Sequence, residues 1–192
     1  MKKYGNDYRQ NGKQFEYTGK WHSTKAEAKE LKQYAWSYTG LMIAAMIVYV
    51  AGLMINNAGS RVFWVLIPFV TMIFPISYGI MGGVSLLLFC RNQEGKGQTS
   101  QVVIPEEHVG HMTRAQYEKG IRRPVRCSIA IVGFAFFTCV ADLILILLKP
   151  TDLVLTRELL FEVVSAITLT LGSVATVQSC RTTVSYTHLR AH

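Results

Sequence analysis

The chain has 192 residues, of which 50% are hydrophobic, and its formal net charge is +8. The hydrophobic residues are concentrated in four long segments, which leaves too little chain for a large water-soluble core. A positive balance can indicate nucleic-acid binding, but a multi-pass membrane protein also needs Lys and Arg in its cytoplasmic loops, so we expect no nucleic-acid partner.

The four apolar segments predict an all-α, polytopic integral membrane protein. About 20 predominantly apolar residues in a helix cross the hydrocarbon core of a bilayer. Because lipid offers no hydrogen-bond partner to a free backbone N–H or C=O group, each segment is expected to be helical. We expect a four-helix transmembrane domain over residues 36–183, with spans at 37–55, 62–90, 127–148 and 153–180.

Residues 1–35 are predicted to be a cytoplasmic segment that leads into the first span. Residues 1–22 are polar but rich in aromatic side chains, and three interpretations remain open: a small hairpin, an irregular lid on the membrane surface, or disorder. Thr24 and Glu27 have the spacing of a capping box. An amphipathic helix is therefore expected to begin there and to continue into the first span.

The second apolar segment contains helix breakers and a pair of glycines. Pro68 and Pro75 each remove a backbone donor, so a kink is expected. Gly79 and Gly83 form a GxxxG pair, which lets another helix approach closely. Two interpretations follow: a broken helix of a transporter, or a kinked structural helix with a helix-packing face, which we favour.

The loop at residues 91–126 is basic and is expected to lie at the cytoplasmic membrane surface. Thr113 and Gln116 predict the N-terminal cap of a short helix over 113–123. The cations in this part of the loop would lie near anionic lipid headgroups, which are an expected partner. They are Lys119, Arg122, Arg123 and Arg126.

Lys and Arg also set the expected orientation. They are abundant before the first span and in the loop at 91–126, and scarce in the other two connections. The bias toward cytoplasmic cations therefore places both termini in the cytoplasm. The chain has the character of a bacterial inner-membrane protein, and we expect it in the cell membrane as a multi-pass protein.

A charged cluster is the candidate site: Asp142, Arg157, Glu158 and Glu162. At a rise of 1.5 Å per residue, Asp142 lies about 10 Å and Glu162 about 13 Å inside the outer boundary of the membrane. Charges at that depth are costly and normally face protein or water. Glu158 and Glu162 share a helix face that continues through small and polar residues. Those residues are Ser165, Gly172, Ser173 and Thr176.

Three interpretations of this cluster remain open. In the first, the cluster forms an ion path in which a carboxylate carries protons. In the second, it forms a helix–helix seam in which Arg157 neutralises Asp142. In the third, Arg157 and Glu158 simply lie at the membrane interface. Enzymatic function is not expected, because the HExxH, GxSxG and GxxxxGK[ST] patterns are absent.

We expect no cofactor or metal. Glu106, Glu107, His108 and His111 match no strong metal motif, and Gly110 disfavours a rigid helix between the histidines. The four cysteines are interpreted as small apolar residues.

The last residues, 184–192, read VSYTHLRAH and resemble the translation of a sequencing-library adapter. We interpret them as an artefact and expect the sequence before them to be a truncated copy of the native chain. The predicted function is a non-catalytic accessory or assembly subunit that associates with other membrane helices. The alternatives are a small ion- or proton-coupled carrier that uses the intramembrane carboxylates, or a fragment of a larger transporter.

Overall fold

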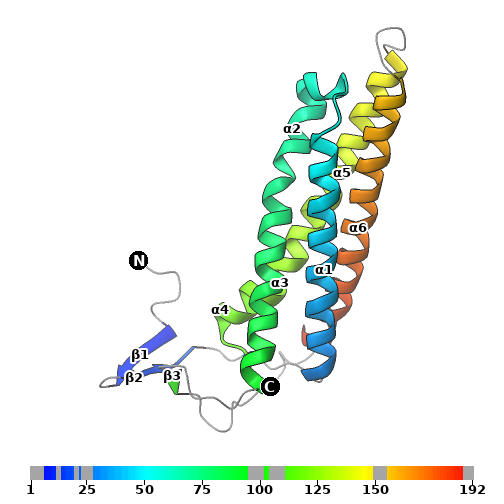
Figure 1. Cartoon of the computed structure of the whole chain (residues 1–192). Helices are drawn as coiled ribbons and strands as arrows, with labels where there is room; N and C mark the ends of the chain where they lie inside the picture. Colours follow the sequence, from blue (N-terminus) through cyan, green and yellow to red (C-terminus); the bar gives the residue numbers. More distant parts are fainter. Residues whose placement is uncertain are drawn as a thin grey trace.

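The computed structural model describes residues 7–11, 14–19, 22, 28–94, 102–103, 111–148 and 155–187. Within these residues, four helical stretches are long and apolar enough to cross a membrane, as predicted. They run side by side as an elongated bundle, with a small sheet at one end (Figure 1). The four stretches are Lys29–Leu53, Phe63–Arg91, Arg114–Leu148 and Leu155–Thr182.

Each stretch packs against two others, which closes the bundle. Helix α1 (Ala28–Leu53) packs against α3 (Ile73–Glu94) and α6 (Leu155–Thr187), and α5 (Arg123–Leu148) also packs against both α3 and α6. The core along the axis is formed by large side chains from all four stretches. They include Tyr38, Met42, Tyr49, Phe69, Met72, Ile131 and Phe161.

The second stretch is divided into α2 (Phe63–Thr71) and α3, with the break at Met72. Pro75 occupies the position whose N–H group would bond to the carbonyl of Thr71, the last residue of α2. Pro68 removes another donor inside α2. The helix is therefore interrupted in the region where the two prolines predicted a kink.

The two glycines of the GxxxG pair face α1 of the same chain. A Cβ atom on Gly79 would lie 2.8 Å from Met42 Sδ, and one on Gly83 would lie 3.2 Å from Thr39 Cβ. Their close-packing face is thus occupied within the bundle.

The third stretch begins earlier than predicted. Thr113 and Gln116 form the expected capping box, with the Gln116 backbone nitrogen 3.3 Å from Thr113 Oγ1. The helix does not end near residue 123, however: α4 (Arg114–Tyr117) passes through a π-helical turn, η4 (Glu118–Arg122), into α5. Pro124 lacks the N–H group that would bond to the carbonyl of Gly120, and the wider turn accommodates this loss.

The N-terminal segment forms a hairpin, one of the three interpretations left open, and adds strands to the predicted all-α fold. Strands β1 (Tyr8–Asn11) and β2 (Gln14–Tyr17) are antiparallel, and β3 (Val102–Val103) pairs parallel to β2. Tyr17 is buried, and its hydroxyl oxygen accepts a 2.9 Å bond from the Arg114 N–H group. Strand β3 was not predicted, because two residues are too short for a period-2 pattern.

Helix α1 is continuous from Ala28 through the first long apolar stretch, while the capping-box residues Thr24 and Glu27 lie outside the described residues. Helix α6 begins at Leu155 and continues to Thr187, so it includes residues 184–187 of the adapter-like tail.

A buried carboxylate site

Glu158 anchors the turn between α1 and α2 at the end of the bundle opposite the sheet (Figure 1). Its side chain is 1% exposed. Its carboxylate accepts hydrogen bonds from the backbone N–H groups of Ala58, at 2.5 Å, and Gly59, at 3.4 Å. The Asn57 amide donates a third bond of 3.3 Å. Three donors therefore converge on one carboxylate and satisfy it as a hydrogen-bond acceptor.

Asp142 lies beside Glu158 but lacks such donors. Its side chain is 0% exposed, and both carboxylate oxygens are without a hydrogen-bond partner. Both carboxyl groups lie against Gly59, because Glu158 accepts from its N–H group and Asp142 Oδ1 would meet a Cβ atom there. Two ionised carboxylates are both acceptors and repel each other, whereas one shared proton creates a hydrogen bond between them.

The backbone of the turn approaches Asp142 closely at Gly59. A Cβ atom at Gly59 would lie 2.6 Å from Asp142 Oδ1, so no side chain fits there. The turn itself is fixed by short bonds, including Ser60 Oγ to the Asn57 carbonyl at 2.7 Å. The absence of a side chain at Gly59 therefore allows the backbone to cover Asp142.

Glu162 and Ser165 extend the cluster by one further turn of α6. Glu162 Oε2 and Ser165 Oγ are buried and have no hydrogen-bond partner, and the Cys139 thiol lies beside the Glu162 carboxyl group. Asn57 Oδ1 is also unpartnered. The region is thus rich in buried oxygen acceptors and poor in donors, a composition that suits protons or another cation.

Arg157 does not neutralise Asp142, so the seam interpretation is wrong in that respect. Its side chain is exposed, and Nη1 lies 3.4 Å from the Asn56 carbonyl oxygen. Consecutive residues point about 100° apart on a helix, and with Glu158 directed inward Arg157 is exposed. Arg157 has the peripheral position that the third interpretation gave it, whereas Glu158 is buried.

The polar stripe below Ser165 is satisfied within α6. Ser173 Oγ donates to the Leu169 carbonyl, and Thr176 Oγ1 donates to the Gly172 carbonyl, each at 2.8 Å. Gly172 packs closely against Ile131 of α5. The lower part of the stripe is therefore a helix–helix seam, and the unpartnered acceptors are confined to its upper part.

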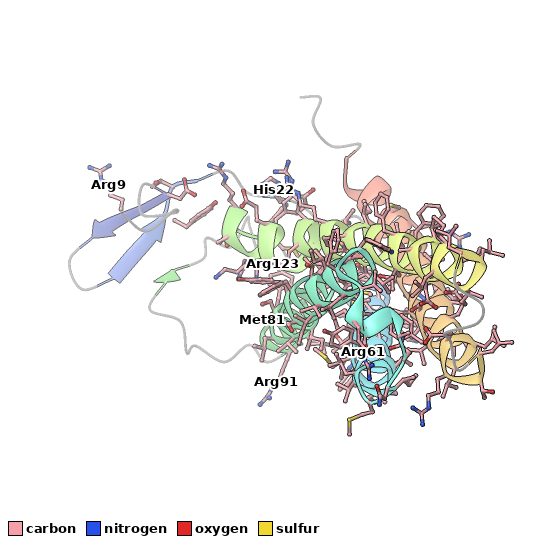
Figure 2. The ribbon with its side chains drawn as sticks, turned by 90° about the horizontal axis from the view of Figure 1, so that it is seen from above. Arg9, His22, Arg61, Met81, Arg91 and Arg123 are labelled. Carbon is pink, nitrogen blue, oxygen red and sulfur yellow. The ribbon has the colours of Figure 1, made fainter. Side chains whose placement is uncertain are left out.

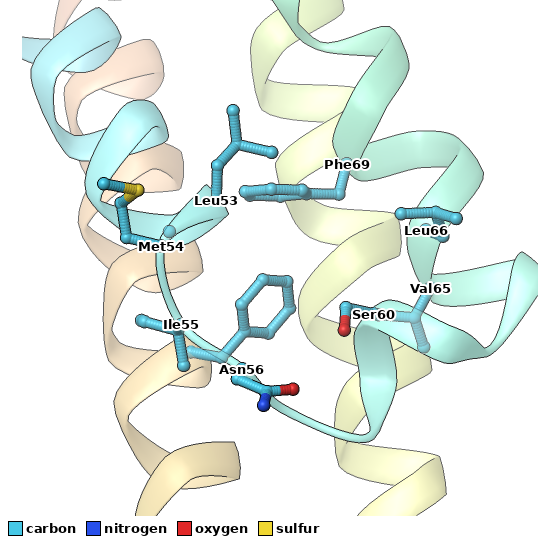
Figure 3. Close-up of a pocket in the computed structure, with 10 residues that line it drawn as sticks. Leu53, Met54, Ile55, Asn56, Ser60, Val65, Leu66 and Phe69 are labelled. Atoms are coloured by element: carbon cyan, nitrogen blue, oxygen red, sulfur yellow. The ribbon is translucent and has the colours of Figure 1, made fainter.

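A cavity of about 250 Å³ lies beside the turn (Figure 3). Asn56 and Ser60 contribute polar groups to its lining, and Phe69 and Phe161 contribute aromatic rings. Val65 lines the cavity and lies next to Gly59, and the backbone of Gly59 covers Asp142. The cavity is therefore separated from the carboxyl pair by the α1–α2 turn.

The other candidate ligands do not join this cluster. Glu106, Glu107 and His108 lie outside the described residues, whereas His111 lies near the sheet end, before α4. Within the described parts of the chain, no group of three or more His, Cys, Asp or Glu residues could hold a metal ion.

Sequence reasoning did not identify Asn57, Gly59 and Cys139 as parts of the site. Asn57 and Gly59 were interpreted only as a connecting turn, and Cys139 as an apolar residue. A signal existed for Cys139, because it lies one helical turn before Asp142 on α5.

Comparisons with models of known protein families, with curated proteins and with solved structures gave no match. The functional argument therefore rests on the geometry of the site.

Proposed function

We propose that this chain is a multi-pass protein of the cell membrane, with its sheet end in the cytoplasm and its α1–α2 turn outside. The four long apolar helices support insertion. The abundance of Lys and Arg before the first span and in residues 91–126 supports the orientation. In this orientation the carboxylate site lies in the outer part of the membrane.

We propose that the protein is a small proton-coupled carrier, and that Asp142 and Glu158 bind the proton. The observation that carries the proposal is Asp142, whose two carboxylate oxygens are fully buried and have no partner. Ionisable groups within membrane spans are costly and commonly mark ion pathways. Arg157, the predicted structural counter-charge, points away.

The proposed mechanism follows from the difference between the two carboxyl groups. Glu158 is held as an acceptor by the turn, whereas Asp142 has no donor, so the shared proton resides on Asp142. Loss of that proton leaves two adjacent negative charges below the turn. Their repulsion favours separation of Asp142 on α5 from Glu158 on α6, which opens the pair while Glu158 stays bound to the turn.

The substitution Asp142→Asn tests the carrier proposal. The new side-chain amide donates to Glu158 as the proton does, so the fold is expected to persist, but the amide cannot release a proton. We expect pH-driven proton uptake into proteoliposomes, measured with an enclosed pH-sensitive dye, to fall at least about tenfold.

The matched control is Glu118→Gln, the same loss of a carboxylate at the sheet end, where Glu118 pairs with Arg114 at 3.6 Å. It should leave proton uptake within about twofold of the wild type. Equal uptake by the wild type and Asp142→Asn, with both proteins folded, would refute the carrier proposal.

An accessory or assembly role is the second candidate, because one small-residue face remains open. Gly79 and Gly83 are occupied by α1, but a Cβ atom on Gly40 would meet no other atom within 4 Å. Ala44 follows one turn later on the same face of α1. Small residues at this spacing let a helix of another subunit approach closely.

Replacing Gly40 with Leu tests this second role. The added side chain would hold a partner helix away from α1 without disturbing the bundle. We expect the mass of the detergent-solubilised complex, measured by light scattering, to fall to that of one chain. The control is Gly133→Leu, where a Cβ atom also meets open space on α5. Identical masses for the wild type and Gly40→Leu would exclude association through this face.

A further inference from the structure

Four cations gather where the third spanning stretch begins. We call this group the basic patch: Lys119, Arg122, Arg123 and Arg126. Their spacing of three and four residues places them along one side of the helix as it passes from η4 into α5. Arg123 is partly buried and the other three side chains are exposed. The patch is therefore a continuous positive surface on an ordered helix.

The patch has no acidic partner within the described part of the chain. Glu118, the carboxylate nearest in sequence, forms its salt bridge with Arg114, at 3.6 Å. The cations of the patch form no ion pair in the described residues. A group of like charges without counter-charges attracts anions from outside the protein.

The position of the patch indicates the kind of anion. The Tyr38 hydroxyl donates a 3.0 Å bond to the Pro124 carbonyl, which places the start of α5 level with the aromatic residues of α1. Trp36, two residues earlier, is 63% exposed. Exposed Trp and Tyr side chains are typical of the headgroup level of a bilayer. The patch therefore lies at the depth of lipid phosphate groups.

Arg123 also lies over an aromatic ring. Its guanidinium carbon lies 5.7 Å from the ring centroid of Tyr78 on α3. Seen along the bundle, Arg123 lies on the same side of the bundle as Met81, another exposed residue of α3 (Figure 2). Contact through the face of a guanidinium leaves the N–H donors at its edge available, and these match the paired oxygens of a phosphate.

We propose that the basic patch binds the phosphate group of an anionic phospholipid, with Arg123 held against Tyr78 and Arg122 and Arg126 supplying further donors. The lipid chains then cover the apolar surface of α3 and α5 next to the patch. This binding is independent of proton transport at the opposite end of the bundle.

The proposal is tested with the full chain in detergent micelles and fluorescent phosphatidylglycerol as the probe, with fluorescent phosphatidylcholine as the neutral comparison. We expect phosphatidylglycerol to bind the wild type at least about tenfold more tightly. The double variant R122Q/R126Q should lose most of that preference, because two headgroup contacts are removed. Arg126→Gln alone should lose part of it and serves if the double variant does not fold.

The matched control is R61Q/R157Q, which removes two exposed cations from the opposite end of the bundle and should retain the preference. Equal binding of the two lipids by the wild type, or an equal loss in the control, would overturn the proposal. Displacement of the fluorescent phosphatidylglycerol by inorganic phosphate would also overturn it, because the site would then bind free phosphate.

Discussion

Replacing Glu158 with Ala is expected to cause one of the largest losses of stability in this protein. The change leaves the Ala58 and Gly59 N–H groups and the Asn57 amide without their buried acceptor. A buried donor without a partner costs about 1–3 kcal/mol, and removing one partner of a buried charged network costs about 3–5 kcal/mol. We expect a loss of about 3–5 kcal/mol in the free energy of unfolding.

Thermal unfolding in detergent, followed by tryptophan fluorescence, measures this loss. Glu158→Gln should cost much less than Glu158→Ala, because its amide oxygen can accept from Ala58 and its NH₂ group can donate to Asp142. Leu159→Ala is the control at the adjacent, half-exposed position, which faces away from the bundle. If Glu158→Ala were neutral or stabilising, Asp142 and Glu158 would both be ionised and repelling in the wild type, and the shared-proton arrangement would be wrong.

The sequence predicted the helical part of the fold because its strongest signal is long apolar runs. Those runs specify four helices, and Pro68 and Pro75 indicate the kink in the second one. They do not specify which helix faces Gly79 and Gly83, since a GxxxG pair serves a partner in the same chain or in another chain equally well. The structure assigns this face to α1.

The sequence identified the carboxylates of the candidate site but not the groups that contact them. Asp142, Glu158 and Glu162 are unusual because they are acidic residues in apolar segments, which a sequence shows directly. Two of the three donors to Glu158 are backbone N–H groups of a turn about 100 residues earlier, and any residue type except proline can supply them. The outward direction of Arg157 depends on where α6 faces the bundle, which helical spacing alone does not determine.

Replacing Gly83 with Leu is the other change expected to have a large effect. A side chain at this position would overlap the Thr39 hydroxyl and approach Tyr38 Cδ1 to about 3.3 Å at its first carbon alone. Both neighbours are buried, and Thr39 Oγ1 is held by a 2.7 Å bond to the Ala35 carbonyl. Helix α1 would have to move away from α3, and we expect a loss of about 2–3 kcal/mol in stability.

The same thermal unfolding measurement compares Gly83→Leu with Gly133→Leu. The control adds an identical side chain to another long apolar helix, but at a position that faces open space, where Leu also improves helix propensity. It should therefore be neutral or slightly stabilising. Similar losses in both variants would mean that leucine is tolerated poorly at either position for reasons other than the α1–α3 contact. A loss confined to Gly83→Leu instead locates helix packing at the GxxxG pair within the chain, so that a partner subunit would have to use another face, such as that of Gly40.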